Sequence, residues 1–344
     1  MKSASQPKFY KKEGKKITPV PGPQETKAAK LRLKEILAAD ENVPDFYKKK
    51  WDDVALYDPS GSVDDARSIL IDPDAGAYHL ENSLNDMTGK EWVKFTCSWF
   101  IFNALRDDLM AEKKLDPTTA HHPATFSPTM VEHFIKFFTK KGATVIDPFC
   151  GIGSTLEACK RTGRKGVGIE LNPKYHKLCL KRTPEFADTI YNMDARKVGE
   201  LKLKNIDFSI SSPPYWDILN RSTKDFKKTR TGKSLDVAYS DNEVDLGNIG
   251  DYNQFIEQTA GVYLSLHKLL KKGAYIVIII KNIKKGGKMY PLAWDLARAL
   301  SDTYTLKDEK IWIQDKVGLA PYGYPYSWAS NILHHYCLVL RKEA

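Results

Sequence analysis

Short apolar runs rich in β-branched residues alternate with amphipathic stretches over the last two thirds of the chain. Runs suited to buried strands lie at residues 144–146, 166–170, 189–194, 206–211 and 274–280, and two further strands are expected at 309–314 and 335–340. The run 274–280 shows no polar alternation, which is typical of a strand covered on both faces. Helices are predicted between the strands at 128–138, 156–161, 173–180, 251–270 and 291–300. This order predicts an α/β fold with a doubly wound, mostly parallel sheet.

The part of the chain before residue 121 gives weaker signals. Residues 1–25 are rich in Lys, Pro and Gly and are predicted to form a flexible basic tail. A helix is expected at 26–39, and 40–77 shows no assignable pattern. A capping box at Thr88 and Glu91 precedes an apolar helical face made by Trp92, Val93, Phe95, Trp99, Phe100 and Leu105. We therefore expect a helical and irregular extension at 26–120 and one domain at 121–344.

Composition narrows the class of protein and of partner. The net charge of +10 and the pI near 9.1 suit a polyanionic partner. The longest apolar run is too short to span a membrane. No C-x-x-C spacing and no signal-peptide pattern occur, so we expect a cytoplasmic protein without disulfides or structural zinc. The five cysteines are Cys97, Cys150, Cys159, Cys179 and Cys337.

The clearest local motif is V-I-D-P-F-C-G-I-G-S-T, from Val145 to Thr155. A strand ends at Asp147-Pro148, Gly151 and Gly153 allow a tight turn, and a helix former follows. A strand, a glycine turn and a helix in this order are typical of a nucleotide-binding crevice. Glu170 ends the next strand about 20 residues further on, where an acid can accept hydrogen bonds from a ribose hydroxyl pair.

A second motif, I-D-F-S-I-S-S-P-P-Y-W, ends another apolar strand at Ser212-Pro213-Pro214-Tyr215. The two prolines fix φ and donate no N–H, so this strand end is stiff and its carbonyls have fixed directions. Taken together, the two motifs resemble the DNA amino-methyltransferases, which methylate exocyclic nitrogens with S-adenosylmethionine. The serine-first tetrapeptide is similar to the N4-cytosine branch of that family. The segments L-N-D-M-T-G-K-E-W and H-P-A-T-F-S, and the ending N-I-L-H-H-Y-C-L-V-L-R-K, also resemble family segments.

The resemblance implies a Rossmann-like class I methyltransferase with a seven-stranded sheet, in which 121–344 is the catalytic domain. It implies catalytic roles for the tetrapeptide Ser212, Pro213, Pro214 and Tyr215. The glycine motif and H-P-A-T-F-S would hold the methionine end of the cofactor, and Asp194 would lie near its adenine. The cofactor-binding residues expected from motif and resemblance are Thr125, Phe126, Ser127, Asp147, Pro148, Phe149, Cys150, Gly151, Gly153, Ser154, Thr155, Glu170, Leu171, Asn172, Asp194, Ala195 and Ser211.

The chemistry of the tetrapeptide follows from the weakness of the nucleophile. The lone pair of a cytosine N4 amino group is delocalised into the ring, so transfer needs acceptors for its N–H groups. The Ser212 hydroxyl and the Pro213 carbonyl are suited to this, and Tyr215 can stack on a flipped base. Cys150 lies in the glycine turn rather than directly after a proline, which favours a place in the cofactor site over a nucleophilic thiol. His121-His122 lack ligand spacing, so no metal is expected.

A polar, basic loop at 217–250 leaves the catalytic strand directly and can follow substrate phosphates, or it is a solvated insertion. Its acidic stretch at 241–251 does not fit phosphate contact. The recognition region is expected either in this loop or in the extension 26–120. The residues expected to contact DNA are Trp216, Arg221, Lys227, Lys228, Arg230 and Lys233.

The leading hypothesis is therefore site-specific N4-cytosine methylation of double-stranded DNA, within a restriction-modification pair whose nuclease would be a separate chain. N6-adenine methylation of DNA is the close alternative, because the first tetrapeptide residue predicts the base imperfectly. Methylation of RNA is a more distant one, with 2′-hydroxyl contacts as its mark. An inactive nucleic-acid-binding module on the same scaffold is disfavoured because both motifs are intact.

Overall fold

The computed structural model describes residues 82–102, 127–216, 245–314 and 318–343, and the backbone of five short strands nearer the N-terminus. The chain divides into two compact units: residues 1–97 with 136–141, and residues 98–135 with 142–344. The helix predicted at 26–39 lies outside the described residues, and the flexibility expected of 1–25 stays a prediction. Across the described ranges, no helix combines the length and the apolar character needed to span a membrane.

In the first unit, the residues that the structure describes form antiparallel strands and the short helix α3. β1 (Phe9–Glu13) pairs with β2 (Lys16–Val20), and β3 (Ala55–Tyr57), β4 (Ile69–Asp72) and β5 (Gly76–His79) form a second sheet. The predicted capping box is confirmed at α3 (Gly89–Phe95), where the Thr88 hydroxyl accepts from Glu91 N and the Glu91 carboxylate accepts from Thr88 N. The predicted apolar helix is too long, however, because α3 ends at Phe95, whose ring stacks on Phe137 at 4.0 Å.

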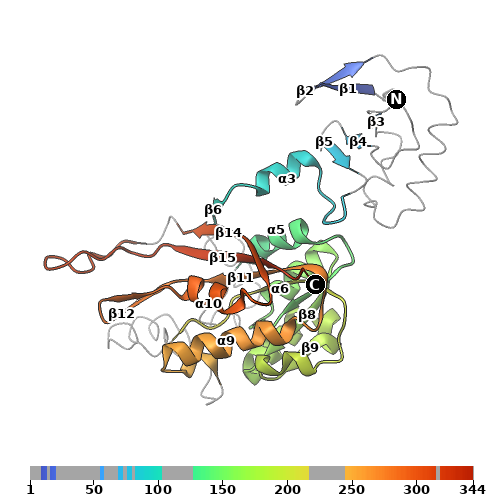
Figure 1. Ribbon diagram of the computed structural model, residues 1–344. Helices are drawn as coiled ribbons and strands as arrows, with labels where there is room; N and C mark the ends of the chain where they lie inside the picture. Colours follow the sequence, from blue (N-terminus) through green and yellow to red (C-terminus); the bar gives the residue numbers. More distant parts are fainter. Residues whose placement is uncertain are drawn as a thin grey trace. The chain divides into compact units, whose positions relative to one another are not determined.

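The second unit is built on an eight-stranded sheet in the order β6-β14-β15-β11-β10-β7-β8-β9 (Figure 1). Pairing is parallel except where β15 runs antiparallel to both β11 and β14, so the mostly parallel α/β fold is confirmed. The strands are β6 (Trp99–Ile101), β7 (Thr144–Asp147), β8 (Lys165–Glu170), β9 (Ile190–Asn192), β10 (Ile206–Ser211), β11 (Leu270–Ile280), β14 (Thr305–Ile313) and β15 (His334–Arg341).

The seven-stranded prediction is wrong by one strand. β6 pairs in parallel with β14 and occupies what would otherwise be the sheet edge, where backbone N–H and C=O groups need partners. Residues Trp99 and Phe100, predicted on a helix, therefore lie in an extended strand. The Phe100 ring meets Phe134 of α5 with their centroids 5.9 Å apart.

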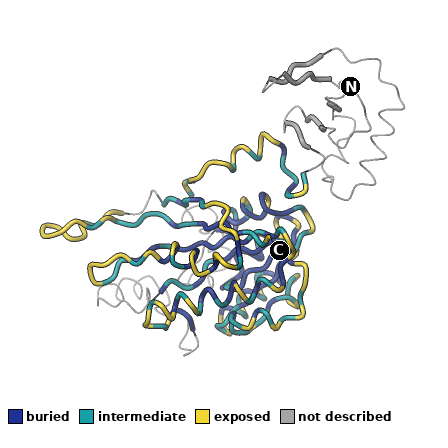
Figure 2. Tube along the Cα trace, in the orientation of Figure 1, coloured by how far each residue is buried: buried dark blue, intermediate teal, exposed yellow. Residues whose placement is uncertain are grey.

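Helices lie along the sheet and leave its central strands buried (Figures 1 and 2). They are α5 (Pro128–Phe138), α6 (Ser154–Thr162), α7 (Pro173–Arg182), α9 (Tyr252–Leu266) and α10 (Leu292–Leu300), with 3-10 helices η3 (Pro184–Thr189), η4 (Ala195–Glu200) and η5 (Leu246–Asn248). A small hairpin, β12 (Ile283–Lys285) and β13 (Lys288–Tyr290), follows β11.

Strand β11 shows why its sequence lacks alternation. Ile276, Ile278 and Ile280 join the apolar cluster built with α9 and α10. Val277 and Ile279, which alternate with them, are also buried, at 0% and 1% exposure. Both faces of this strand are therefore covered, as the unbroken apolar run predicted.

A matched pair of serines on β10 tests the packing of this sheet. The Ser211 hydroxyl lies 2.8 Å from the buried Tyr263 hydroxyl, whereas the Ser209 hydroxyl is buried without a partner. We expect Ser211→Ala to lower the free energy of unfolding by about 1–2 kcal/mol, because Tyr263 then loses its partner, and Ser209→Ala to leave it unchanged or raise it. Thermal and urea unfolding of both variants measure this, and an equal loss in the two would contradict the assignment.

Candidate functional site

The glycine turn closes tightly behind β7. Gly151 and Gly153 have φ of 54° and 87°, and Gly153 N donates to Cys150 O at 2.8 Å before α6 begins. A Cβ on Gly153 would lie 2.7 Å from the Cys179 Sγ atom. Both the left-handed backbone and this close approach require glycine at position 153, so the turn predicted from sequence has a steric cause.

The Asp147 carboxylate stabilises this turn through two hydrogen bonds. It accepts from Phe149 N at 2.9 Å and from the Thr155 hydroxyl at 2.6 Å, so it joins the strand end to the first turn of α6. Burial raises the pKa of the Asp147 carboxyl to about 7, although the two hydrogen bonds act in the opposite direction. The side chain is fully buried, and it is not among the residues that line the pocket described below.

Glu170, at the carboxyl end of β8, spans the other side of the turn. Its two oxygens accept from Gly151 N at 2.9 Å and Asn172 N at 2.7 Å. Burial raises the pKa of this carboxyl to about 7, against the effect of these bonds. Glu170 therefore fixes the glycine turn to the end of β8 and lines the pocket with its remaining surface.

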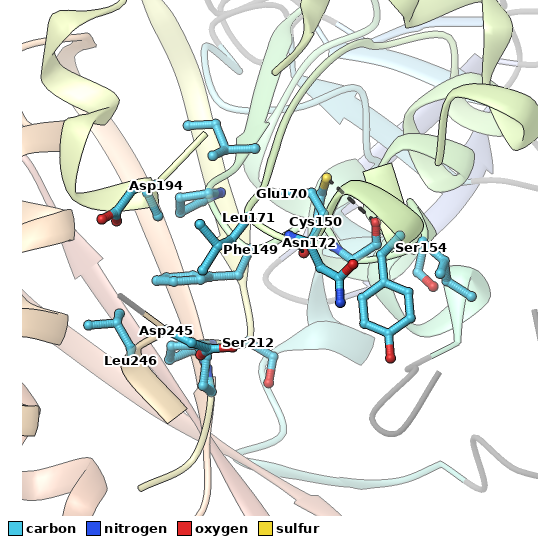
Figure 3. Close-up of a pocket in the computed structure, with 18 of the residues that line it drawn as sticks. Phe149, Cys150, Ser154, Glu170, Leu171, Asn172, Asp194, Ser212, Asp245 and Leu246 are labelled. Carbon is cyan, nitrogen blue, oxygen red and sulfur yellow. Dashed lines mark hydrogen bonds between the residues drawn. The ribbon is translucent and has the colours of Figure 1, made fainter. Parts of the chain in front are cut away.

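Asp194 follows β9 and begins η4. Burial favours a higher pKa for its carboxyl, but hydrogen bonds from Arg196, whose guanidinium lies 2.5 Å away, hold the pKa below its ordinary value. Asp194 stays ionised at neutral pH, at the end of the pocket opposite Ser154 (Figure 3).

The tetrapeptide continues from β10, whose neighbours are β7 and β11. Ser212 is half-buried, and its hydroxyl lies 3.2 Å from that of Tyr215. The Tyr215 ring lies 6.0 Å from the imidazole of His335, the second residue of β15. Burial lowers the pKa of His335 to about 3, with Lys281 and His334 adding to the effect, so this ring is neutral.

One pocket brings the two motifs together, with Ser212 and Asp245 on the side opposite Glu170 (Figure 3). Parallel strands end at the same sheet edge, so β7, β8 and β10 deliver their motifs to one place. Predicted site residues that line it are Pro148, Phe149, Cys150, Gly151, Ser154, Glu170, Leu171, Asn172, Asp194, Ala195, Ser212, Pro213, Pro214 and Tyr215.

Other predicted cofactor residues lie behind the pocket rather than on it. Ser127 is buried and its hydroxyl accepts from Met130 N at 3.3 Å, so it serves the start of α5. The Thr155 hydroxyl donates to Asp147, a Cβ at Gly153 would meet Cys179 Sγ, and the Ser211 hydroxyl hydrogen-bonds the Tyr263 hydroxyl. These residues position the lining.

Five lining residues were missed from the sequence: Ile152, Ile169, Tyr175, Asp245 and Leu246. Ile152 and Ile169 lie inside or beside the predicted motifs and could have been included with them. Asp245 and Leu246 are different, because they lie within the loop 217–250, in the acidic stretch 241–251 for which the sequence suggested no role. Asp245 is 4% exposed, and its carboxylate accepts from Gly247 N at 2.8 Å to begin η5.

Several predicted residues lie outside the described part of the chain: Thr125, Phe126, Arg221, Lys227, Lys228, Arg230 and Lys233. Trp216, predicted to contact DNA, is described and is 4% exposed. Its indole N–H donates to Gly250 O at 3.2 Å, and the Lys285 ammonium lies 4.4 Å from its ring centroid. The structure thus places Trp216 in the core, and the DNA contact there stays a prediction.

The amino-acid sequence matches a family model for DNA methylases over residues 9–181, just over half of its length. The chain belongs to this family, as the two motifs predicted. The match includes the glycine turn and Glu170 and ends before the tetrapeptide. The role predicted for Ser212–Tyr215 therefore depends on the sequence motif and on the geometry of the pocket.

Curated relatives are similar over shorter segments. The type II methyltransferase M.MjaII of Methanocaldococcus jannaschii is 32% identical over 148 residues, covering 40% of this chain and 23% of the relative. The type II methyltransferase M.BglI of Bacillus subtilis is 30% identical over 118 residues, covering 34% and 30%. The chain thus spans less than a third of these relatives. Among solved structures, TrmN of Thermus thermophilus is 15% identical over 62% of this chain and 48% of that chain, at a TM-score of only 0.39.

S-adenosylmethionine is the cofactor of this family, and the pocket fits it. The Ser154 hydroxyl lines the pocket and is buried without a hydrogen-bond partner, so it is available to a polar ligand. Apolar side chains of Phe149, Ile169 and Leu246 offer surface to an adenine ring. Glu170 supplies acceptors at the end of β8, where a ribose is expected.

The buried acid below the turn gives a pH-dependent stability. With a folded pKa near 7 and an ordinary aspartate pKa of 3.8 in the unfolded chain, Asp147 binds more protons in the folded state, so its contribution to stability falls as pH rises from about 4 to 7. Asparagine keeps the acceptor for Phe149 N without a titrating charge. We expect Asp147→Asn to gain stability relative to the parent between pH 5 and 8, by roughly 3 kcal/mol at most. Urea unfolding across this range tests it, and parallel pH curves would contradict it.

Proposed function

We propose that this chain is an S-adenosylmethionine-dependent methyltransferase that modifies the exocyclic N4 amino group of cytosine in DNA. The observation that supports it most strongly is the single pocket in which the glycine turn, Glu170 and Ser212–Tyr215 meet. A cofactor site alone would suit many reactions. The stiff tetrapeptide beside it adds acceptors suited to an amino group.

The chain's own residues divide the work of binding. Glu170 would accept hydrogen bonds from ribose hydroxyls, and the Asp194 end of the pocket would take the adenine. Gly151 and Ser154 would hold the amino-acid end. The bound cofactor supplies an electrophilic methyl group on a positively charged sulfur. Phe149 and Leu246 exclude water from this space, which strengthens the fixed dipoles around it.

The tetrapeptide residues act on the base. Ser212 Oγ and the Pro213 carbonyl would accept hydrogen bonds from the two N–H groups of the amino nitrogen, which concentrates electron density on that nitrogen as it attacks the methyl carbon. The methyl–sulfur bond would break with its electron pair going to sulfur, so that S-adenosylhomocysteine leaves, and one of the two amino protons would pass to solvent. The hydroxyl of Tyr215, 3.2 Å from Ser212 Oγ, orients that serine, and its ring offers a stacking face to a base flipped out of the duplex. Rigid positioning and preorganised acceptors supply most of the acceleration.

The match to the DNA methylase family supports DNA as the substrate, and relatives named as type II methyltransferases support methyl transfer. Expression in a host without DNA methylation, followed by mass spectrometry of the genomic nucleosides, tests the proposal. N4-methylcytosine is the expected product. N6-methyladenine would retain the mechanism and overturn the base assignment. Unmodified DNA from a preparation that binds the cofactor would overturn the proposed substrate. A separately encoded nuclease partner stays a prediction.

Two variants separate catalysis from cofactor binding. We expect Ser212→Ala to lower kcat by roughly 100-fold or more with an unchanged cofactor Kd, because the lost acceptor acts on the reacting nitrogen. Glu170→Gln should show the opposite pattern, a raised cofactor Kd with a smaller loss of kcat at saturation. Calorimetric titration with S-adenosylmethionine and single-turnover transfer measure both. Near-normal transfer by Ser212→Ala would sink the catalytic assignment.

A further inference from the structure

Two hairpins leave the sheet at the carboxyl ends of its parallel strands, where the tetrapeptide also lies. One, residues 281–290, contains β12 and β13 and follows the carboxyl end of β11. The other, residues 318–333, leads into β15, whose antiparallel pairing places Tyr336 opposite Ile280 at that same end. Both extend in the same direction beyond the sheet (Figure 1). The 6.0 Å approach of His335 to Tyr215 shows how close the second hairpin begins to the catalytic strand.

The second hairpin, 318–333, ends in an exposed aromatic tip. Tyr322, Tyr324, Tyr326 and Trp328 are 61%, 81%, 94% and 88% exposed. Figure 2 shows this tip as an exposed extension of the chain. Large exposed apolar groups gathered in one place mark an interaction surface, because scattered single residues are the ordinary case.

Hydrogen bonds within residues 318–333 hold the tip in shape. Gly323 O accepts from Tyr326 N at 2.8 Å and Ser327 N at 2.7 Å. Gly323 has a φ of 81°, and a Cβ there would clash with the Ser327 carbonyl oxygen. The amide of Asn331 pairs with both backbone groups of Ala320. A preformed tip loses little conformational entropy on binding.

The first hairpin supplies positive charge beside the aromatic rings. Residues 281–290 contain Lys281, Lys284, Lys285 and Lys288, and neither 281–290 nor 318–333 contains an acidic residue. The Lys284 ammonium donates to Ser330 O at 2.7 Å and Ser330 Oγ at 2.9 Å, and it lies 5.8 Å from the Trp328 ring centroid. These contacts join the two hairpins into one surface.

We propose that residues 281–290 and 318–333 form a contact surface for duplex DNA next to the target base. The lysines would neutralise flanking phosphates, and the aromatic tip would enter a groove and stack against a base step. A two-stranded ribbon fits the major groove, and apolar side chains that wedge between base pairs unstack them. This inference rests on the proposed function and adds the place where the duplex is held while a base is extruded.

In a binding experiment with the full chain, the salt dependence of DNA affinity separates phosphate contact by the lysines from base stacking by the aromatic tip. The probe is a fluorescein-labelled DNA duplex of mixed sequence, titrated at several salt concentrations. We expect the double variant Lys284→Gln/Lys288→Gln to reduce the slope of log K against log salt by about 2, one per lost phosphate contact. The variant Tyr326→Ala/Trp328→Ala should weaken binding roughly ten-fold with the slope unchanged, because stacking releases no counterions.

Matched controls exclude general effects of charge and folding. Lys204 and Lys272 are exposed at the opposite edge of the same sheet, near the starts of β10 and β11, so Lys204→Gln/Lys272→Gln should leave the slope unchanged. Tyr326→Phe/Trp328→Phe keeps the rings and should restore binding. All variants should retain cofactor affinity.

The proposed surface would be overturned if the Lys284/Lys288 and Lys204/Lys272 variants reduced the salt slope equally. It would also be overturned if Tyr326→Ala/Trp328→Ala bound the duplex as tightly as the parent. Tighter binding of the matching RNA duplex than of DNA would also overturn it. These outcomes differ from failure of the proposed function. If the host DNA contained no methylated base but duplex binding still depended on the two hairpins, the proposed activity would be refuted and the proposed DNA-contact surface would stand.

Discussion

The glycine turn depends on acceptors for backbone N–H groups that have lost their place in a strand or helix. Two carboxylates at neighbouring strand ends supply them, Asp147 to Phe149 N and Glu170 to Gly151 N. Because β7 and β8 pair in parallel, both acids arrive at the same edge. The turn is thereby fixed between the two strands, and every other wall of the pocket is placed relative to it.

Burying these two carboxylates lowers the stability of the folded chain. Burial raises the pKa of both carboxyls to about 7, which means that their charged forms are poorly solvated without a ligand. A ribose that donates to Glu170 would favour its ionised form, so ligand binding and ionisation support each other there. Asp147 has Thr155 as its donor and makes its contribution through the turn alone. Both acids thus serve the backbone of the turn, and of the two only Glu170 also lines the pocket.

Antiparallel β15 determines what surrounds the tetrapeptide. Its reversal brings His335 and the hairpin 318–333 to the carboxyl edge, about 120 residues after Ser212 in the chain. The hairpin 281–290 lies at the same end of the sheet because it directly follows the carboxyl end of β11. A chemically distinct surface, aromatic and basic, therefore lies beside β10 and its tetrapeptide, although no sequence motif joins its parts.

The sequence by itself determined the local motifs: the glycine turn, Glu170 at its distance from the glycines, the stiff tetrapeptide, the doubly covered β11 and the capping box at Thr88. Each depends on backbone freedom, φ restriction or periodicity within a few residues, which sequence records directly. Only the tertiary structure decided the eighth strand, the burial of Trp216 and the presence of Asp245 and Tyr175 on the pocket. β6 has three residues, too few for a periodic signal, and forms because β14 offers it an edge. Trp216 and Asp245 take their places through packing between segments far apart in the chain, and no local pattern encodes such contacts.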